Sequence, residues 1–424
     1  MAVWKKKKSS HDDSINIELS EKHSKLRMIL FVLVLAFGLT MIGRGLYLML
    51  TEDPGWRTVE PNKTKELNCS EDFVFMYNIG ASGVSATQEY RDIVSIYSDA
   101  TMKAYQLFTS YSSYEDINNV YYINQHPNEE IEVDEVLYEA FSLLQKYENR
   151  NIYLAPVYVQ YDDLFYCEDD SLIKEFDPFT NEEVAEYYQE IATYAADSQM
   201  VDIQLLGDHK IMLYVSDEYM DYAEENYIST FIDFFWMKNA FIVDYLADVM
   251  ITNGYTLGTI SSFDGFVRNL DDSETTYSFN IFDKAEEDDD GVYAAAIMQY
   301  SGQNSIVYLR NYSMYELDTE YYYQLDNGEV RTSYLDIQDG KCRSAMNNLV
   351  SYSYDMGCAE VLMQTIPVYI TETLDETAIE GLQESGIYSV YCVDKVIKYN
   401  DSNVNMEDVF ENETVKYTLE KTMK

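Results

Sequence analysis

The chain has 424 residues and a net charge of −46, with 75 acidic residues against 29 basic ones. Such an acidic surface repels nucleic acid, so a nucleic-acid-binding protein is excluded. Hydrophobic residues make up 47% of the sequence, which excludes a disordered chain and leaves a folded protein.

The first recognisable element is an apolar stretch over residues 28–50. It carries no charge before Arg44 and is long enough for a helix to cross a bilayer. Basic residues precede it, among them Lys5–Lys8, and acidic ones follow it, so the positive-inside rule predicts a cytoplasmic tail over residues 1–27. Residues 51–424 are then extracytoplasmic. A cleaved signal peptide is the alternative, but no small-residue cleavage site follows the stretch.

The outer region carries 71 acidic and 21 basic residues and is organised as an α+β domain. Residues 51–71 hold two prolines and are interpreted as a linker. Apolar spacing predicts helices over 89–108 and 134–148, a third helix after residue 181 and a fourth from about residue 237 to 250. Strands predominate after about residue 195, beginning with a hairpin over 200–215. This order predicts a central, largely antiparallel sheet over residues 72–400, followed by a charged tail over 401–424.

The order of these elements and several short sequence motifs resemble those of the ApbE-type FAD:protein FMN transferases. The segment FTSY at residues 108–111 resembles the family's F-S-x-Y, and the likeness extends from about residue 73 to 399. The resemblance implies a T-fold-related domain outside the bacterial cytoplasm. It also implies a use of FAD and Mg²⁺ to attach FMN to a threonine or serine of a partner protein.

Departures from the family pattern fall in its flavin loop, which reads D-L-G-G/A-I-A-K-G-Y-x-x-D. Here residues 233–244 read DFFWMKNAFIVD, so Asp233 and Asp244 keep their separation. Phe235 and Trp236 stand where the family has small residues, and Lys238 lies one position before the family's lysine. Bulky side chains at these positions would block the close backbone approach that a pyrophosphate requires.

The family's other site motifs are also altered. Its N-x-G-G-N becomes SFDGF at residues 262–266, which leaves Asp264 and Gly265 as candidate cofactor-binding residues together with Asp233, Lys238 and Asp244. Its D-P-x-T-G turn becomes DIQDG at residues 336–340. Its metal pair, an aspartate and a threonine four apart, falls on Val361 and Thr365, with Glu360 one position early. Glu360 and Thr365 are therefore the candidate Mg²⁺ ligands.

Three hypotheses about function remain open. The first is a membrane-anchored, degenerate flavin- or protein-binding module with an eroded active site and no required cofactor, serving an envelope flavoprotein or a redox complex. The second is an active transferase that uses FAD and Mg²⁺. The third is an unrelated acidic surface module without a ligand. The sequence leaves open whether the protein is an enzyme.

Overall fold

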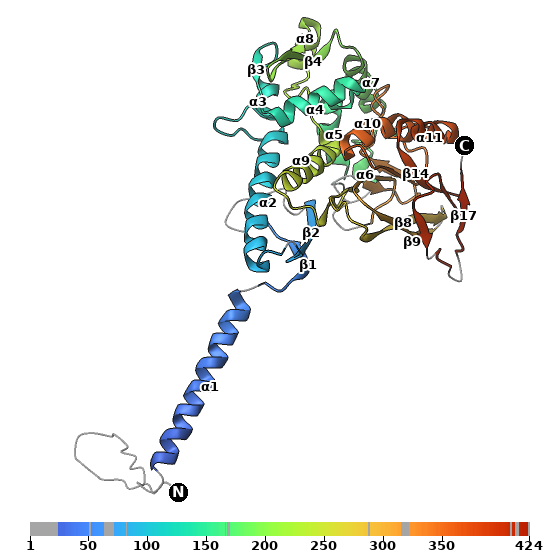
Figure 1. Cartoon of the computed structure of the whole chain (residues 1–424). Helices are drawn as coiled ribbons and strands as arrows, with labels where there is room; N and C mark the ends of the chain where they lie inside the picture. The colour runs from blue at the N-terminus through green and yellow to red at the C-terminus, as the bar shows by residue number, and fades with distance from the viewer. Residues whose placement is uncertain are drawn as a thin grey trace, which may run out of the picture.

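The computed structural model describes residues 24–50, 52–62, 72–81, 83–165, 167, 170–286, 289–314, 322–407, 409–411 and 415–422. A long helix, α1 (Ser24–Leu50), projects from a mixed α+β body (Figure 1). Its window Met28–Gly45 is long and apolar enough to cross a membrane, and the rest of the described chain covers none of it.

The remaining helices gather on one side of the body and at one end of it (Figure 1). They are α2 (Ala86–Phe108), α3 (Val120–Gln125), α4 (Glu135–Lys146), α5 (Ala155–Phe165), α6 (Asp170–Ile173), α7 (Glu182–Ala196), α8 (Asp217–Glu225), α9 (Lys238–Thr252), α10 (Cys358–Tyr369) and α11 (Glu376–Leu382), with 3₁₀ turns η2 (Asn151–Leu154), η3 (Phe235–Met237) and η5 (Gln383–Ser385).

A nine-stranded sheet forms the centre, in the order β1-β2-β6-β7-β10-β13-β14-β15-β17. Its strands are β1 (Gly55–Val59), β2 (Phe73–Ile79), β6 (Gly258–Ser262), β7 (Phe266–Asn269), β10 (Asn304–Arg310), β13 (Asn348–Ser353), β14 (Tyr388–Val393), β15 (Val396–Tyr399) and β17 (Thr418–Lys421). Every neighbouring pair is antiparallel except β15 and β17, which run parallel. The predicted α+β class with a largely antiparallel sheet is confirmed.

Smaller sheets flank the central one. They are β3-β5-β4, made of β3 (Glu130–Glu132), β4 (Val201–Gly207) and β5 (Lys210–Val215); β16-β9-β8, made of β8 (Thr276–Glu286), β9 (Asp289–Ser301) and β16 (Asn405–Glu407); and β11-β12, made of β11 (Tyr322–Gln324) and β12 (Val330–Thr332). The predicted hairpin over 200–215 is β4 and β5, and it turns at Asp208 and His209, which both have positive φ.

Two hydrophobic cores cover the two faces of the central sheet. Along β10, Val307 and Leu309 belong to the core under α9 and α10, whereas Ile306 and Tyr308 belong to the core under the β8–β9 hairpin. All seven residues of β10 are buried as a result. Because successive residues of a strand point to opposite faces, burial of all of them places β10 in the middle of the fold.

Strands also form at both ends of the outer region. Val59 of β1 is buried, and β1 pairs with β2 although it lies within the stretch interpreted as a linker. Residues 401–424, interpreted as a charged tail, supply β16 and β17. Val415 and Tyr417 anchor this segment because they are buried in the second core. The folded body therefore extends beyond residues 72–400 on both sides.

Candidate functional site

The stretch that resembles the flavin loop begins at Asp233, which is buried. Its carboxylate accepts hydrogen bonds from Ser110 Oγ (2.6 Å) and from the backbone N–H of Phe235 (2.8 Å). Burial raises the pKa of Asp233, and those hydrogen bonds, together with the charge of Lys238, act in the opposite direction. Both carboxylate oxygens are therefore engaged in fixing the turn that leads into α9.

Phe235 holds a backbone conformation that suits glycine. Its φ is +41°, in a region that costs a bulky L-residue about 1 kcal/mol or more. The ring stacks on Tyr158, with 4.6 Å between ring centroids and 19° between ring planes. An aromatic residue thus holds a backbone conformation that glycine would adopt without strain, and its ring fills the space beside the loop.

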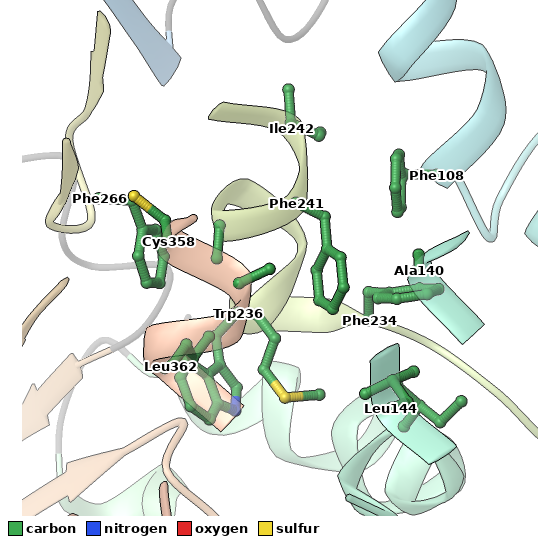
Figure 2. Packing of buried hydrophobic residues seen from close by; sticks show 14 of the residues in the cluster. Phe108, Ala140, Leu144, Phe234, Trp236, Phe241, Ile242, Phe266, Cys358 and Leu362 are labelled. Carbon is green, nitrogen blue, oxygen red and sulfur yellow. The ribbon is translucent and has the colours of Figure 1, made fainter. Parts of the chain in front are cut away.

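Trp236 fills the adjacent space. It is 4% exposed and belongs to the buried cluster that Figure 2 shows around α9 and α10. Its ring meets that of Tyr334 edge to face at 4.9 Å. The cavity that remains beside Trp236, Asp264 and Arg310 measures about 30 Å³, which is the space of about one water molecule. A flavin ring does not fit there.

Asp264 and Gly265 lie on the turn between β6 and β7, next to this cavity. Asn239, which stands at the family's lysine position, donates from Nδ2 to Asp264 Oδ2 at 2.9 Å. Burial raises the pKa of Asp264 to about 6. Gly265 has a φ of +112°, and a Cβ there would lie 2.4 Å from the carbonyl oxygen of Tyr308. The close approach of β10 accounts for this glycine without any ligand.

Asp244, on α9, caps the next helix. It accepts hydrogen bonds from the backbone N–H groups of Cys358 (2.7 Å) and Ala359 (2.8 Å), at the start of α10, and from Arg268 Nη1 (2.7 Å). Gly357 makes this approach possible, because a Cβ there would lie 2.4 Å from Asp244 Oδ2. The positive end of α10, which would otherwise attract an anion, is occupied by the protein's own carboxylate.

Glu360 and Thr365, the candidate metal ligands, point to different surroundings. Glu360 Oε1 accepts hydrogen bonds from Lys146 Nζ (2.5 Å) and Tyr147 OH (2.6 Å). Partial burial tends to raise the pKa of Glu360, but these hydrogen bonds lower it overall. Thr365 is fully buried, and its hydroxyl donates to the carbonyl oxygen of Val361 at 2.8 Å. The fold does not bring these two side chains together.

The residues that do gather around Glu360 are Lys146, Tyr147 and Gln364, which sequence analysis missed. Gln364 Nε2 lies 3.3 Å from Tyr147 OH. The spacing of Glu360 and Gln364 by four residues is a signal for one helix face and could have been noticed. Lys146 and Tyr147 lie at the C-terminal end of α4, which is remote from Glu360 in sequence, so no local pattern indicates their contact with Glu360.

These residues do not fit a Mg²⁺ ion. The cation beside Glu360 is the ammonium group of Lys146, whereas Mg²⁺ requires a near-octahedral set of oxygen ligands. Across the residues that the structure describes, no group of three or more His, Cys, Asp and Glu side chains is arranged to hold a metal.

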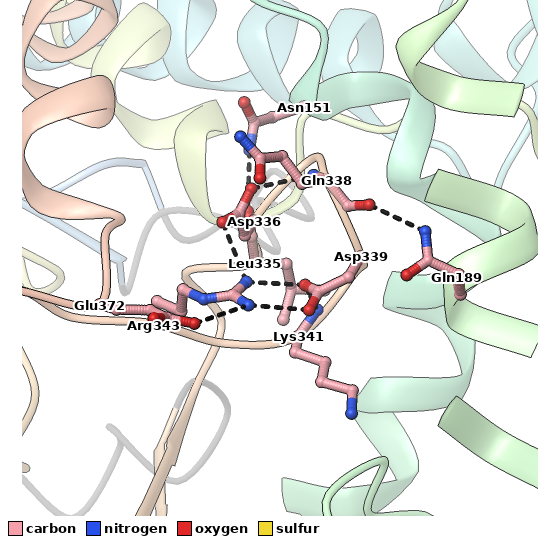
Figure 3. Close-up of polar contacts among 9 residues, drawn as sticks. All are labelled: Asn151, Gln189, Leu335, Asp336, Gln338, Asp339, Lys341, Arg343 and Glu372. Atoms are coloured by element: carbon pink, nitrogen blue, oxygen red, sulfur yellow. Dashed lines mark hydrogen bonds and ion pairs between the residues drawn. The ribbon is translucent and has the colours of Figure 1, made fainter. Parts of the chain in front are cut away.

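The turn at residues 336–340 is closed by ion pairs (Figure 3). Arg343 Nη1 contacts Asp336 Oδ2 at 2.9 Å and Asp339 Oδ1 at 2.7 Å, while Nη2 contacts Asp339 Oδ2 at 2.8 Å. Glu372 approaches the same guanidinium at 3.5 Å. Three carboxylates thus neutralise the arginine, so its charge is not available to bind a phosphate.

An open cleft of about 730 Å³ lies between α4, α9 and the start of α10. Of the predicted site residues, Asp244 and Glu360 line it, whereas Asp264 borders the small cavity beside Trp236. Asp233 is placed apart from both, beside Ser110. The predicted residues therefore form no single site.

No protein-family model matches the sequence, and no curated protein matches it. Among solved structures, the fold is similar to the ApbE protein of Thermotoga maritima, with a TM-score of 0.51 and 13% identity over 78% of this chain and 93% of that chain. The flavin transferase ApbE from Vibrio cholerae matches with a TM-score of 0.51 and 12% identity over 79% of this chain and 92% of that one. The resemblance to ApbE is confirmed at the level of the fold.

Proposed function

We propose that this chain, which has the ApbE fold, is a membrane-anchored extracytoplasmic protein that binds a partner protein and has lost FAD:protein FMN transferase chemistry. Its partner would be an envelope flavoprotein or a subunit of a redox complex. Helix α1 is the proposed anchor, with residues 1–27 in the cytoplasm. A module of unrelated fold, the third hypothesis, does not agree with the ApbE fold.

One observation carries the proposal. Trp236 and Phe235 occupy the position where the family's flavin loop has small residues, and about 30 Å³ of cavity remains beside Trp236. Transfer of FMN from FAD requires donors and a metal around the pyrophosphate. Here the start of α10 is capped by Asp244, and Glu360 is paired with Lys146. Asp244 and Glu360, two of the groups that could have served the reaction, therefore already have partners within the protein.

The test is FMN attachment by the full chain in a neutral detergent, mixed with FAD, Mg²⁺ and a threonine-bearing acceptor protein. The flavin transferase from Vibrio cholerae is the positive control. We expect no fluorescent acceptor band on a denaturing gel. Calorimetry should likewise give no FAD binding in the micromolar range, which corresponds to about −8 kcal/mol.

A covalent band that requires Mg²⁺ would contradict this proposal and establish the active transferase. The variants Glu360→Gln and Thr365→Ala would then locate the metal. If both variants abolished the band, Glu360 and Thr365 would be its ligands after a rearrangement of α10. A band that survived both changes would place the metal elsewhere.

A further inference from the structure

The open cleft between α4, α9 and α10 has an apolar wall and an acidic rim. Phe241, Tyr245 and Val249 of α9 and Leu143 of α4 contribute to the wall. Five carboxylates line the cleft, against one guanidinium; they are Glu139, Asp244, Asp248, Asp355 and Glu360, and the guanidinium is that of Arg268. The charge of the cleft is therefore strongly negative.

Two of these carboxylates are closely paired within the protein, a third, Asp248, is paired at longer range, and two are unpaired within the described chain. Arg268 pairs with Asp244 at 2.7 Å, and Lys146 pairs with Glu360 at 2.5 Å. Asp248 is 71% exposed and lies 3.9 Å from Arg268 Nη2. Within the described chain, the side chains of Glu139 and Asp355 form no hydrogen bond or ion pair. A cation entering the cleft would thus meet carboxylates that are available to it.

A buried amide gives an independent indication of a ligand. Asn304, the first residue of β10, lines the cleft and is only 3% exposed. In the part of the chain that the structure describes, neither its amide nitrogen nor its amide oxygen has a hydrogen-bond partner. Leaving a buried polar group unsatisfied costs about 1–3 kcal/mol. A ligand with both a donor and an acceptor, such as a peptide, would satisfy this amide.

The apolar wall, the acidic rim and the capped start of α10 together indicate the class of ligand. Aromatic and aliphatic side chains suit the methylene stem of lysine or arginine, whose charged group then reaches the acidic rim. The ring of Tyr245 already has a cation near it, because Lys103 Nζ lies 5.8 Å from the ring centroid. An anionic ligand is disfavoured, since Asp244 caps α10 and the rim repels negative charge.

We propose that this cleft binds a lysine- or arginine-bearing peptide segment of the partner protein. The inference rests on the proposed function, because it names the chemistry of the partner that a protein-binding module would take. The ammonium or guanidinium group pairs with Glu139, Asp248 and Asp355, and the peptide backbone reaches Asn304. The binding is non-covalent and involves no cofactor.

The experiment is calorimetric titration of the full chain in neutral detergent with a tetralysine peptide blocked at both ends. The double variant Glu139→Gln/Asp248→Asn should weaken binding about tenfold, because it removes two charges from the rim. The matched control, Asp217→Asn/Glu218→Gln, removes two exposed charges from α8 and should weaken binding less than twofold. The same peptide with acetylated lysines should not bind. Equal losses in the two double variants would overturn the proposal in favour of general attraction to an acidic surface.

Asn304→Ala provides a second readout. If the amide serves a ligand, this variant should weaken peptide binding severalfold without lowering the melting temperature, because it removes an unsatisfied buried group. A lower melting temperature with unchanged binding would assign Asn304 to the fold and overturn its role. These results are separate from the FAD assays, so the cleft can fail as a peptide site while the loss of transferase chemistry stands.

Discussion

Trp236 is a single side chain on which both the packing and the proposed loss of flavin binding depend. It lies in the main core beside Tyr334, and it replaces a residue that is small in the family. Trp236→Ala should lower the free energy of unfolding by about 3–5 kcal/mol, because it leaves a large cavity. Urea unfolding of the full chain in detergent measures this loss.

Tyr227→Ala is the control for this prediction, since Tyr227 is an aromatic residue that is 94% exposed. That change should alter the free energy of unfolding by less than about 0.5 kcal/mol. Similar losses in the two variants would mean that Trp236 does not fill the core as described.

The raised pKa of Asp264 predicts that the stability of the protein depends on pH. The folded state keeps its proton up to about pH 6, whereas an ordinary aspartate loses its proton near 3.8. The folded state therefore binds more protons than the unfolded state between these values, and stability falls as the pH rises through this window. The loss attributable to Asp264 is at most about 3 kcal/mol.

Asp264→Asn should remove this part of the pH dependence, so the variant should gain stability relative to the parent between pH 4 and pH 6. Thermal unfolding at half-unit intervals of pH measures the difference. Asp217→Asn, at an exposed position on α8, is the control for removing one carboxylate from the surface. Parallel curves for the parent and Asp264→Asn would rule out the raised pKa.

At the scale of elements, Asp244 of α9 joins α9 to α10 by accepting hydrogen bonds from the first backbone N–H groups of α10. Gly357→Ala should destabilise the protein by about 1–3 kcal/mol, because the new Cβ would lie 2.4 Å from a carboxylate that three donors hold in place. Gly381→Ala is the matched control. Gly381 lies inside α11 with open space around it, so alanine there should raise the free energy of unfolding by about 0.5–1 kcal/mol. Chemical denaturation compares the two, and a loss of equal size in both would contradict the close contact.

The longer helices could be predicted from sequence because their signals are local. The helix predicted after residue 181 is α7, and Asn181 caps it through the N–H groups of Glu183 and Val184. The helix predicted over 89–108 is α2, with Ile93, Tyr97 and Leu107 buried on its inner face. Such periodicity depends on a few neighbouring residues and survives divergence.

The site could not be predicted in the same way, because its contacts join distant parts of the chain. Asp244 and Cys358 are 114 residues apart, and Lys146 and Glu360 are 214 residues apart. The family motifs indicated the positions of the candidate site residues but not the residues that contact them in the fold. Thr365, which aligned with a metal ligand, is held by the backbone of its own helix.

At the scale of the whole molecule, we expect the basic residues before α1 to set the orientation in the membrane. A reporter enzyme that is active only outside the cytoplasm should be active when joined after residue 424 and inactive when joined at residue 10. Replacing Lys5–Lys8 with glutamine should weaken this preference, because these residues supply much of the basic excess. Activity of the residue-10 fusion in the unmodified chain would reverse the proposed topology.

The short connection between α1 and β1 limits where the body can be. Helix α1 ends at Leu50 and β1 begins at Gly55, so the chain between them spans at most about 18 Å when fully extended. If α1 is anchored, the body stays within a thin layer beside the bilayer. A partner anchored in the same membrane would then be met at a high effective concentration, and a weak contact could suffice. A soluble partner would gain nothing from this confinement.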